Sequence, residues 1–391
     1  MIALLALLCA SADDVEEIVV IRAGRIITGK GDEIRDGVIL IVGGKIKRIG
    51  RDVEIPAGAK PIDASSKTVI PGLIDAGSTL GIEGSANEDS REVTPDLRIL
   101  DMIDPESREL ARARQCGITT VFVAPGNRSV IGGLAAVIKT HGASRAAMTV
   151  RDEIALKAAM GGAPTSGNYP PRGSQATLYA RRPTTRMGVV WEFKKAFIDA
   201  RESSAKEGGN AVLRLAMEGK LPVRVAASRA TDIEMILRLA DELNLTIVLE
   251  EAQEAYKVAD QLATKKVPVL LRPEFSALDG SEGSEIRFDA FRRLSEKGVR
   301  VALLPAQADN PDSLFGAAAL LVKHGTKREE ALRAVTLGAA EILGVSDRVG
   351  SLEEGKDGDL VILSGDPLDA TSRIETVIIG GARVFGERKD R

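Results

Sequence analysis

The sequence has few histidines, cysteines and aromatic residues, and each shortage narrows the possible functions. Its 391 residues include two His and two Cys, so a His-rich or Cys-rich zinc centre is excluded. Aromatic residues make up 3%, which argues against a stacking platform for single-stranded nucleic acid. The net charge of -3 argues against a broadly basic surface. Nucleic acid is therefore not an expected partner.

The N-terminal twelve residues form a short apolar run that ends in Ala10-Ser11-Ala12. This pattern is typical of a secretory signal peptide over 1–12, and it predicts export to the periplasm or the exterior. The run is too short to span a membrane as a helix. A misassigned start codon and a buried first strand are the alternatives. Cleavage after Ala12 would leave Cys116 as the only cysteine, which excludes an intramolecular disulfide.

The two ends of the chain share a β-rich composition. Residues 13–70 and 350–391 contain short apolar runs separated by Gly and Asp, which indicate strands and turns. Two such ends can pair with each other and bring the termini together. We therefore predict one small composite domain, a β-sandwich, built from both terminal segments.

The central residues, 71–349, contain strands that alternate with amphipathic helices. From about residue 220 the alternation repeats roughly every twenty residues, and the strands are continuous apolar runs. Repeated strand–helix units predict parallel strands buried on both faces. We predict an α/β fold with a (β/α)8 TIM-type barrel, and a doubly wound open sheet is the alternative. Residues 161–188 lack periodicity and are expected to form a long loop, a lid or a solvated insertion.

Several motifs resemble one family. Residues 69–75, VIPGLID, resemble the entry to the barrel in the amidohydrolase superfamily, and 350–361, GSLEEGKDGDLV, resemble its return to the small β domain. Residues 93–98, 117–121 and 182–188 are similar to segments of the imidazolonepropionase-like group. The resemblance implies a barrel with a composite β domain. It also implies hydrolysis of amide-type C–N bonds, other than those of ordinary peptides, by a metal-activated water.

That chemistry uses zinc or another divalent metal held by histidines and a carboxylate. The family's histidine positions fall here on residues of other types: Gly77, Thr79, Ala226 and Ser228. The following strand end has Glu250-Glu251 where a histidine is expected, and Asp309 comes several residues too late to be the closing aspartate. Loss of a whole set of ligands removes the binding energy that holds the ion. We therefore expect no metal ligand and no cofactor.

Three functional hypotheses remain. The first is a pseudoenzyme that binds a small-molecule ligand or a partner at the barrel mouth, through these candidate residues: Gly77, Thr79, Ala226, Ser228, Arg229 and Glu250. The second is an active hydrolase with a rebuilt site, with Glu251 and Asp309 as catalytic candidates. These two carboxylates, with Glu250 and Asp75, would form a hard-cation site or a metal-free acid/base pair. The third is a structural subunit in a homo-oligomer or paired with an active paralogue.

The two histidines and Lys139 have simpler interpretations. His141 follows a strand-like run and is the better site candidate of the two histidines, because His324 ends a helix where the helix dipole favours it. Lys139 resembles a lysine that some relatives carbamylate to bridge two metals. Without metals such a carbamate has no support, so we expect an ordinary lysine.

Overall fold

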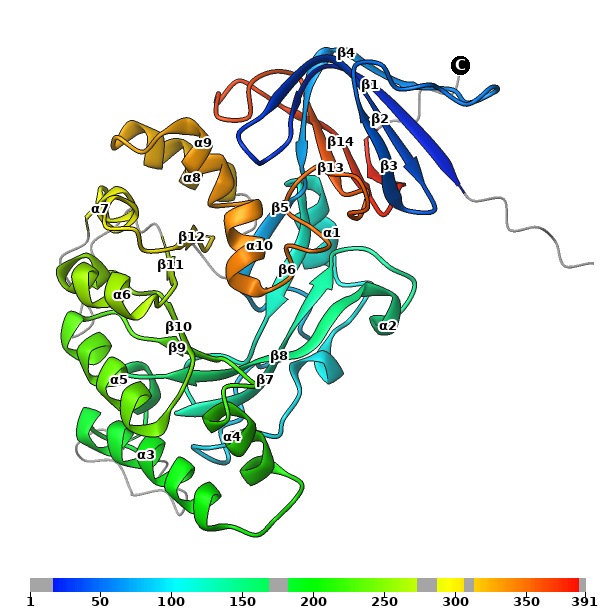
Figure 1. Cartoon of the computed structure of the whole chain (residues 1–391). Coiled ribbons are helices and arrows are strands. Elements are labelled where there is room, and N and C mark those ends of the chain that lie inside the picture. The colour runs from blue at the N-terminus through cyan, green and yellow to red at the C-terminus, as the bar shows by residue number, and fades with distance from the viewer. Residues whose placement is uncertain (1–16, 169–181, 273–286, 306–312, 387–391) are drawn as a thin grey trace, which may run out of the picture.

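The computed structural model describes residues 17–168, 182–272, 287–305 and 313–386. The segment 1–12, expected to be a signal peptide, lies outside these ranges, and so does Asp309. The described strands form two sheets, one of seven strands and one of eight. Figure 1 shows the first strands of the chain beside the last ones, in the part of the molecule where the blue and red segments meet.

The seven-stranded sheet combines both ends of the chain in the order β15-β14-β13-β4-β1-β2-β3. Its strands are β1 (Ile18–Ile27), β2 (Glu33–Val42), β3 (Lys45–Gly50), β4 (Ile62–Pro71), β13 (Leu360–Leu363), β14 (Ile374–Ile379) and β15 (Ala382–Phe385). The N-terminal and C-terminal parts join where β4 pairs antiparallel with β13. Buried β-branched residues such as Ile21, Ile39 and Ile378 share one core. The hydrogen bonds link all seven strands in a single sheet.

The eight-stranded sheet has the order β12-β11-β10-β9-β8-β7-β6-β5. Its strands are β5 (Leu73–Ser78), β6 (Ile118–Val123), β7 (Ile131–Lys139), β8 (Thr149–Ala159), β9 (Val223–Ala226), β10 (Ile247–Glu250), β11 (Val269–Leu271) and β12 (Val301–Leu303). The pairings from β8 to β12 are parallel, as the alternating pattern predicts. β7 is the exception, since it runs antiparallel to both β6 and β8. Its connections to these neighbours are short, and a short connection cannot make the crossover that parallel strands need.

The helices begin and end as follows: α1 (Arg108–Gln115), α2 (Arg145–Met148), α3 (Arg186–Glu202), α4 (Gly209–Met217), α5 (Ala230–Leu243), α6 (Ala259–Lys265), α7 (Ala290–Glu296), α8 (Ser313–Lys323), α9 (Arg328–Arg333) and α10 (Leu337–Leu343), with 3-10 turns η1 (Ile99–Met102), η2 (Ala163–Thr165) and η3 (Ala255–Val258). The predicted alternation is present as β9-α5-β10-α6-β11-α7-β12. No helix within the described ranges is long and apolar enough to cross a membrane. The irregular stretch 161–188 holds η2 and the start of α3, and 169–181 lie outside the described residues.

The backbone between α9 and α10 contacts both ends of the eight-stranded sheet. The Leu303 N–H donates to the Ala334 carbonyl at 3.1 Å, and the Ile74 N–H donates to the Val335 carbonyl at 2.9 Å. Residues 328–343 form two short helices, α9 and α10, with a break between them. At the break, the Ala334 carbonyl accepts a hydrogen bond from β12 and the Val335 carbonyl accepts one from β5.

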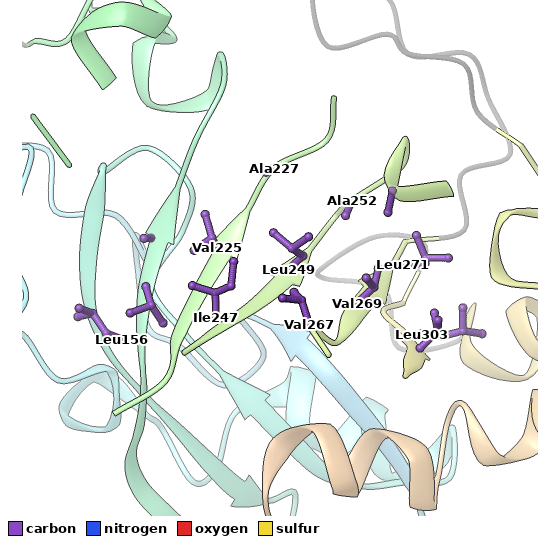
Figure 2. Close-up of a cluster of buried hydrophobic side chains, with 14 of the residues drawn as sticks. Leu156, Val225, Ala227, Ile247, Leu249, Ala252, Val267, Val269, Leu271 and Leu303 are labelled. Carbon is purple, nitrogen blue, oxygen red and sulfur yellow. The ribbon is translucent and has the colours of Figure 1, made fainter. Parts of the chain in front are cut away.

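Alternation along the strands separates two apolar layers. Figure 2 shows Leu156, Val225, Leu249 and Leu271 in the cluster that faces the helices. Their sequence neighbours point to the opposite, interior face of the sheet, where Val248 and Leu270 pack. Because side chains alternate with a period of two, Lys157, Arg224 and Glu250 share that interior face. Three charged side chains thus enter a largely apolar layer.

Candidate functional site

The centre of the site is an ion cluster of Lys157 on β8, Arg224 on β9 and Glu250 on β10. Parallel pairing places Lys157 directly beside Arg224, and it aligns Glu250 with Ala226 on the neighbouring strand. All three charged residues are buried. Burial of charges is costly unless they are paired, so their mutual contacts decide whether the arrangement is stable.

The carboxylate of Glu250 forms ion pairs with both cations of this cluster. Arg224 donates to Oε2 of Glu250 from Nη2 at 2.7 Å and from Nε at 3.1 Å. Lys157 Nζ forms an ion pair with the other oxygen, Oε1. The Arg224 guanidinium also donates to the Ala76 carbonyl at 2.8 Å and lies 3.6 Å from the centre of the Phe122 ring. Both oxygens of Glu250 are therefore engaged.

A second ion pair lies beside the first. Arg272, just after β11, donates to Oε1 of Glu251 at 2.8 Å, and Asn127 Nδ2 donates to Oε2 at 2.9 Å. Glu251 has a φ of 55°, a left-handed conformation that is unfavourable for a residue with a side chain. Such strain persists only where surrounding contacts hold it, and it is common at functional sites.

Asp75, in the middle of β5, is fully buried. Its Oδ1 accepts a hydrogen bond from the Gly77 N–H at 2.9 Å, while Oδ2 has no hydrogen-bond partner in the described part of the chain. Burial raises the pKa of Asp75 to about 6, against the opposing effect of the hydrogen bonds from Gly77 and Ser78. Its carboxyl group therefore changes protonation near neutral pH.

The cations respond to burial in the opposite direction. Burial lowers the pKa of Lys157 to about 7; the charges of Arg224 and Arg272 add to this shift, and Glu251 opposes it. Burial also lowers the pKa of Arg224, with Asp75 and Glu251 opposing the change. In Glu251 burial acts to raise the pKa, but Arg272 and Lys157 outweigh it and hold the pKa below its usual value.

A small cavity of about 90 Å³ adjoins both ion pairs. Its lining includes four of the residues singled out from the sequence, namely Gly77, Thr79, Glu250 and Glu251. Ala226 ends β9 and is buried, but it lies outside this lining. Ser228 and Arg229 also lie outside the lining, between the end of β9 and the start of α5.

Sequence reasoning missed three polar residues of the site, Asn127, Lys157 and Arg272, and considered Arg224 only as an ion-pair partner of the acidic strand ends. A signal was present for Lys157, because a lysine inside the apolar run IALKAAM must either be paired or destabilise the sheet. Arg224 similarly interrupts the run LPVRVAA. Their common partner, Glu250, comes from another strand, so the cluster itself could be recognised only in three dimensions.

The other residues considered for the site lie elsewhere. Lys139 is buried and forms an ion pair with Asp357 at 2.9 Å and a second one with Asp359. His324 stacks on Phe288, with ring centres 4.8 Å apart. His141 is exposed at the residue level, yet burial of its ring and the Arg114 charge lower its pKa. Neither histidine lines the cavity.

The residues present do not fit a divalent metal. A β-carbon on Gly77, at a family ligand position, would lie 2.8 Å from Cδ2 of Leu304 and 3.1 Å from Nη2 of Arg224. The space that a ligating side chain would enter is thus filled by an apolar group and a cation. Among the residues that the structure describes, no three His, Cys, Asp or Glu are grouped so that they could hold a metal ion.

Comparison with known proteins gives the family. The model of the Amidohydrolase family matches residues 110–385. The chain is 30% identical to an amidohydrolase from Thermotoga maritima of known crystal structure, with a TM-score of 0.86 over 94% of this chain and 100% of that one. It is 25% identical to the amidohydrolase tasK of Hapsidospora irregularis, over 90% of this chain and 40% of that protein.

A shorter match is to the imidazolonepropionase of Thermoplasma volcanium, 38% identical over 84 residues, which is 20% of this chain and 21% of that enzyme. The chain therefore aligns with less than half the length of these two curated relatives. The family model nevertheless covers more than half of the chain, and the Thermotoga maritima structure matches almost all of it. The chain belongs to the amidohydrolase family.

Proposed function

We propose that this amidohydrolase-family protein binds a small molecule in the cavity beside Glu250 and Glu251 without a metal ion, and that it lacks metal-dependent hydrolysis. The observation that carries the proposal is the position of Arg224. Its guanidinium occupies the volume beside Gly77 that a metal-ligating side chain would need.

Electrostatics support the same conclusion. Lys157 and Arg224 bring two positive charges to the site and take up both oxygens of Glu250. A divalent cation would have to displace at least one of them and leave a buried charge without its partner. Breaking a buried pair in this way costs about 3–5 kcal/mol. The protein's own cations thus replace a bound ion in the charge balance of the site.

The rebuilt-site alternative has less support. A hard cation needs several oxygens with free lone pairs. Here Glu250 is held by two cations, and Glu251 accepts from Arg272 and Asn127. Asp75 is the carboxyl group best suited to metal-free acid/base chemistry, because its pKa of about 6 lies near the working pH.

Three further proposals complete this assignment. The eight-stranded sheet closes into a (β/α)8 barrel through Ala334 and Val335, supported by their hydrogen bonds to β12 and β5. The domains are 13–70 with 350–391, and 71–349. The mature chain is exported and begins at Asp13, which mass spectrometry of protein from the native host would test; an N-terminus at Met1 would contradict cleavage.

The test of the proposed function is metal content. Protein purified without chelators is dialysed against trace zinc, manganese and magnesium, then measured by mass spectrometry beside a known zinc protein treated identically. We expect less than about a tenth of an equivalent, since functional metal sites normally bind tightly. About one equivalent or more would overturn the proposal and direct substitutions to Glu251 and Asp309.

A further inference from the structure

Lys157 places a primary amine in the wall of the cavity. Its side chain is 4% exposed, and the residue lines the same cavity as Thr79 and Asn127. The side chain extends from the interior face of β8, and its Nζ is buried beside Glu250 at the wall of the cavity.

Burial and two neighbouring arginines leave a substantial part of Lys157 in the neutral form near pH 7, although its pairing with Glu250 favours the charged form. It shares the single carboxylate of Glu250 with Arg224, and Arg272 adds a third cation to the cluster. Glu251 opposes this effect but is itself paired with Arg272. Burial and the neighbouring cations lower the pKa of Lys157 to about 7. A desolvated lysine next to another cation is a well-known form of amine nucleophile.

Asn127 adds a selective polar group. Its Nδ2 donates to Glu251 at 2.9 Å, which fixes the orientation of the amide. Its Oδ1 is buried and has no hydrogen-bond partner in the described ranges. Because Asn127 lines the cavity, an unpartnered acceptor on its side chain favours a ligand that carries an O–H or N–H donor. The volume of about 90 Å³ equals that of about three water molecules, so it suits a ligand of few heavy atoms.

We propose that Lys157 forms an imine with a small hydroxy-aldehyde or hydroxy-ketone, whose hydroxyl group donates to Oδ1 of Asn127. This inference rests on the proposed function, because it requires the cavity to be free of metal. Hydroxy-aldehydes and hydroxy-ketones are then the ligand class of the metal-free cavity.

The reaction balances without an oxidant or a reductant. The Nζ lone pair forms a bond to the carbonyl carbon, and the C=O π electrons move to oxygen. Both amine protons then transfer to that oxygen, which leaves as water when the C=N bond forms. Glu250 contacts Nζ through Oε1 and can carry these protons from nitrogen to oxygen.

The test uses glycolaldehyde as the probe on the full-length protein. A brief incubation at about pH 7.5 is followed by borohydride reduction, which converts the imine into a stable amine, and then by peptide mass mapping. We expect Lys157 to be labelled at least about tenfold more than the exposed Lys220, because burial and the neighbouring cations lower the pKa of Lys157 to about 7. The buried Lys139, which lies outside the cavity lining, is the internal control and should not be labelled.

Two variants sharpen the test. Lys157→Arg keeps the charge but removes the nucleophilic amine, so this adduct should disappear. Asn127→Leu should reduce the preference for glycolaldehyde over acetaldehyde by about fivefold or more, since one hydrogen bond is worth about 1 kcal/mol. Labelling of wild-type Lys157 no greater than that of Lys220 overturns the inference, whether or not the variants fold.

Metal analysis of the same sample separates the two proposals. A metal-free protein without an adduct overturns the imine and leaves the proposed function standing. A metal-loaded protein overturns both.

Discussion

A β-carbon on Gly77 would lie 3.1 Å from Nη2 of Arg224, so these two positions compete for one volume. Gly77 stands at a position where the family resemblance places a metal ligand, and Arg224 comes from a different strand. The small residue leaves room for the large cationic one.

The first prediction tests this shared volume. Gly77→Ala should lower the free energy of unfolding by about 1–3 kcal/mol, because the new β-carbon also lies 2.8 Å from Leu304. In an Arg224→Met background the cost should be smaller, with a coupling energy above about 0.5 kcal/mol. Urea unfolding of the four proteins measures both quantities.

A suitable control for that cycle is Gly316→Ala. Gly316 lies in α8, and a β-carbon there would meet nothing within 4 Å. This substitution should stabilise the helix by about 0.5–1 kcal/mol. Additive effects of the substitutions at 77 and 224 would contradict the shared volume.

The second prediction concerns the ion cluster. Glu250→Gln leaves Lys157 and Arg224 buried without a counter-ion, so it should cost about 3–5 kcal/mol of stability in denaturant unfolding. Glu354→Gln removes an exposed carboxylate paired with Arg48 and should cost about 1 kcal/mol or less. Equal losses in both variants would show that Glu250 does not compensate the two cations.

The third prediction is a pH dependence caused by Asp75. Its pKa is raised to about 6 in the folded protein from an ordinary value of 3.8. Its contribution to stability is therefore complete below about pH 4 and is lost as the pH rises through 6. Two pKa units correspond to about 3 kcal/mol.

Asp75→Asn removes that titration but can still accept from the Gly77 N–H. The stability of the variant relative to the wild type should rise between about pH 4 and 6 and stay constant above about pH 7. Thermal or urea unfolding over this range measures the difference. A flat difference from pH 4 to 7 would disprove the assignment of this pKa to Asp75.

The fourth prediction concerns Lys139, which is paired with Asp357 and Asp359. Lys139→Met leaves two buried carboxylates without this cation and should destabilise the fold by about 3–5 kcal/mol. Lys45 pairs with the same Asp357 but is half exposed, so Lys45→Met should cost about 1 kcal/mol or less. Comparable losses in denaturant unfolding would mean that burial does not set the strength of these pairs.

Local patterns were sufficient to predict much of the fold. The alternation that predicts β9, α5 and β10 depends on residues close in sequence, and a continuous apolar run identifies a strand with both faces buried. Local patterns do not reveal the break between α9 and α10, because it depends on hydrogen bonds from Leu303 and Ile74 to distant backbone. The antiparallel direction of β7 was not predicted either, although it agrees with the short connections to β6 and β8.

The site was predicted in part, for a related reason. Gly77, Thr79, Glu250 and Glu251 were found because motif positions marked the strand ends. Lys157 and Arg224 were missed as site residues, because the search was directed at metal ligands. Their role as ion-pair partners is evident only once Glu250 is placed beside them. The pairing of Lys139 with Asp359, 220 residues away, could not be inferred from spacing either.

The terminal sheet has a consequence for synthesis on the ribosome. β4 pairs with β1 on one side and with β13 on the other, so one edge stays open until almost the whole chain has been translated. Until then its backbone N–H and C=O groups are free to pair with another nascent chain. The free edge of β4, complete at residue 71, is therefore covered only after β13, in the last 32 residues of the sequence, has been made.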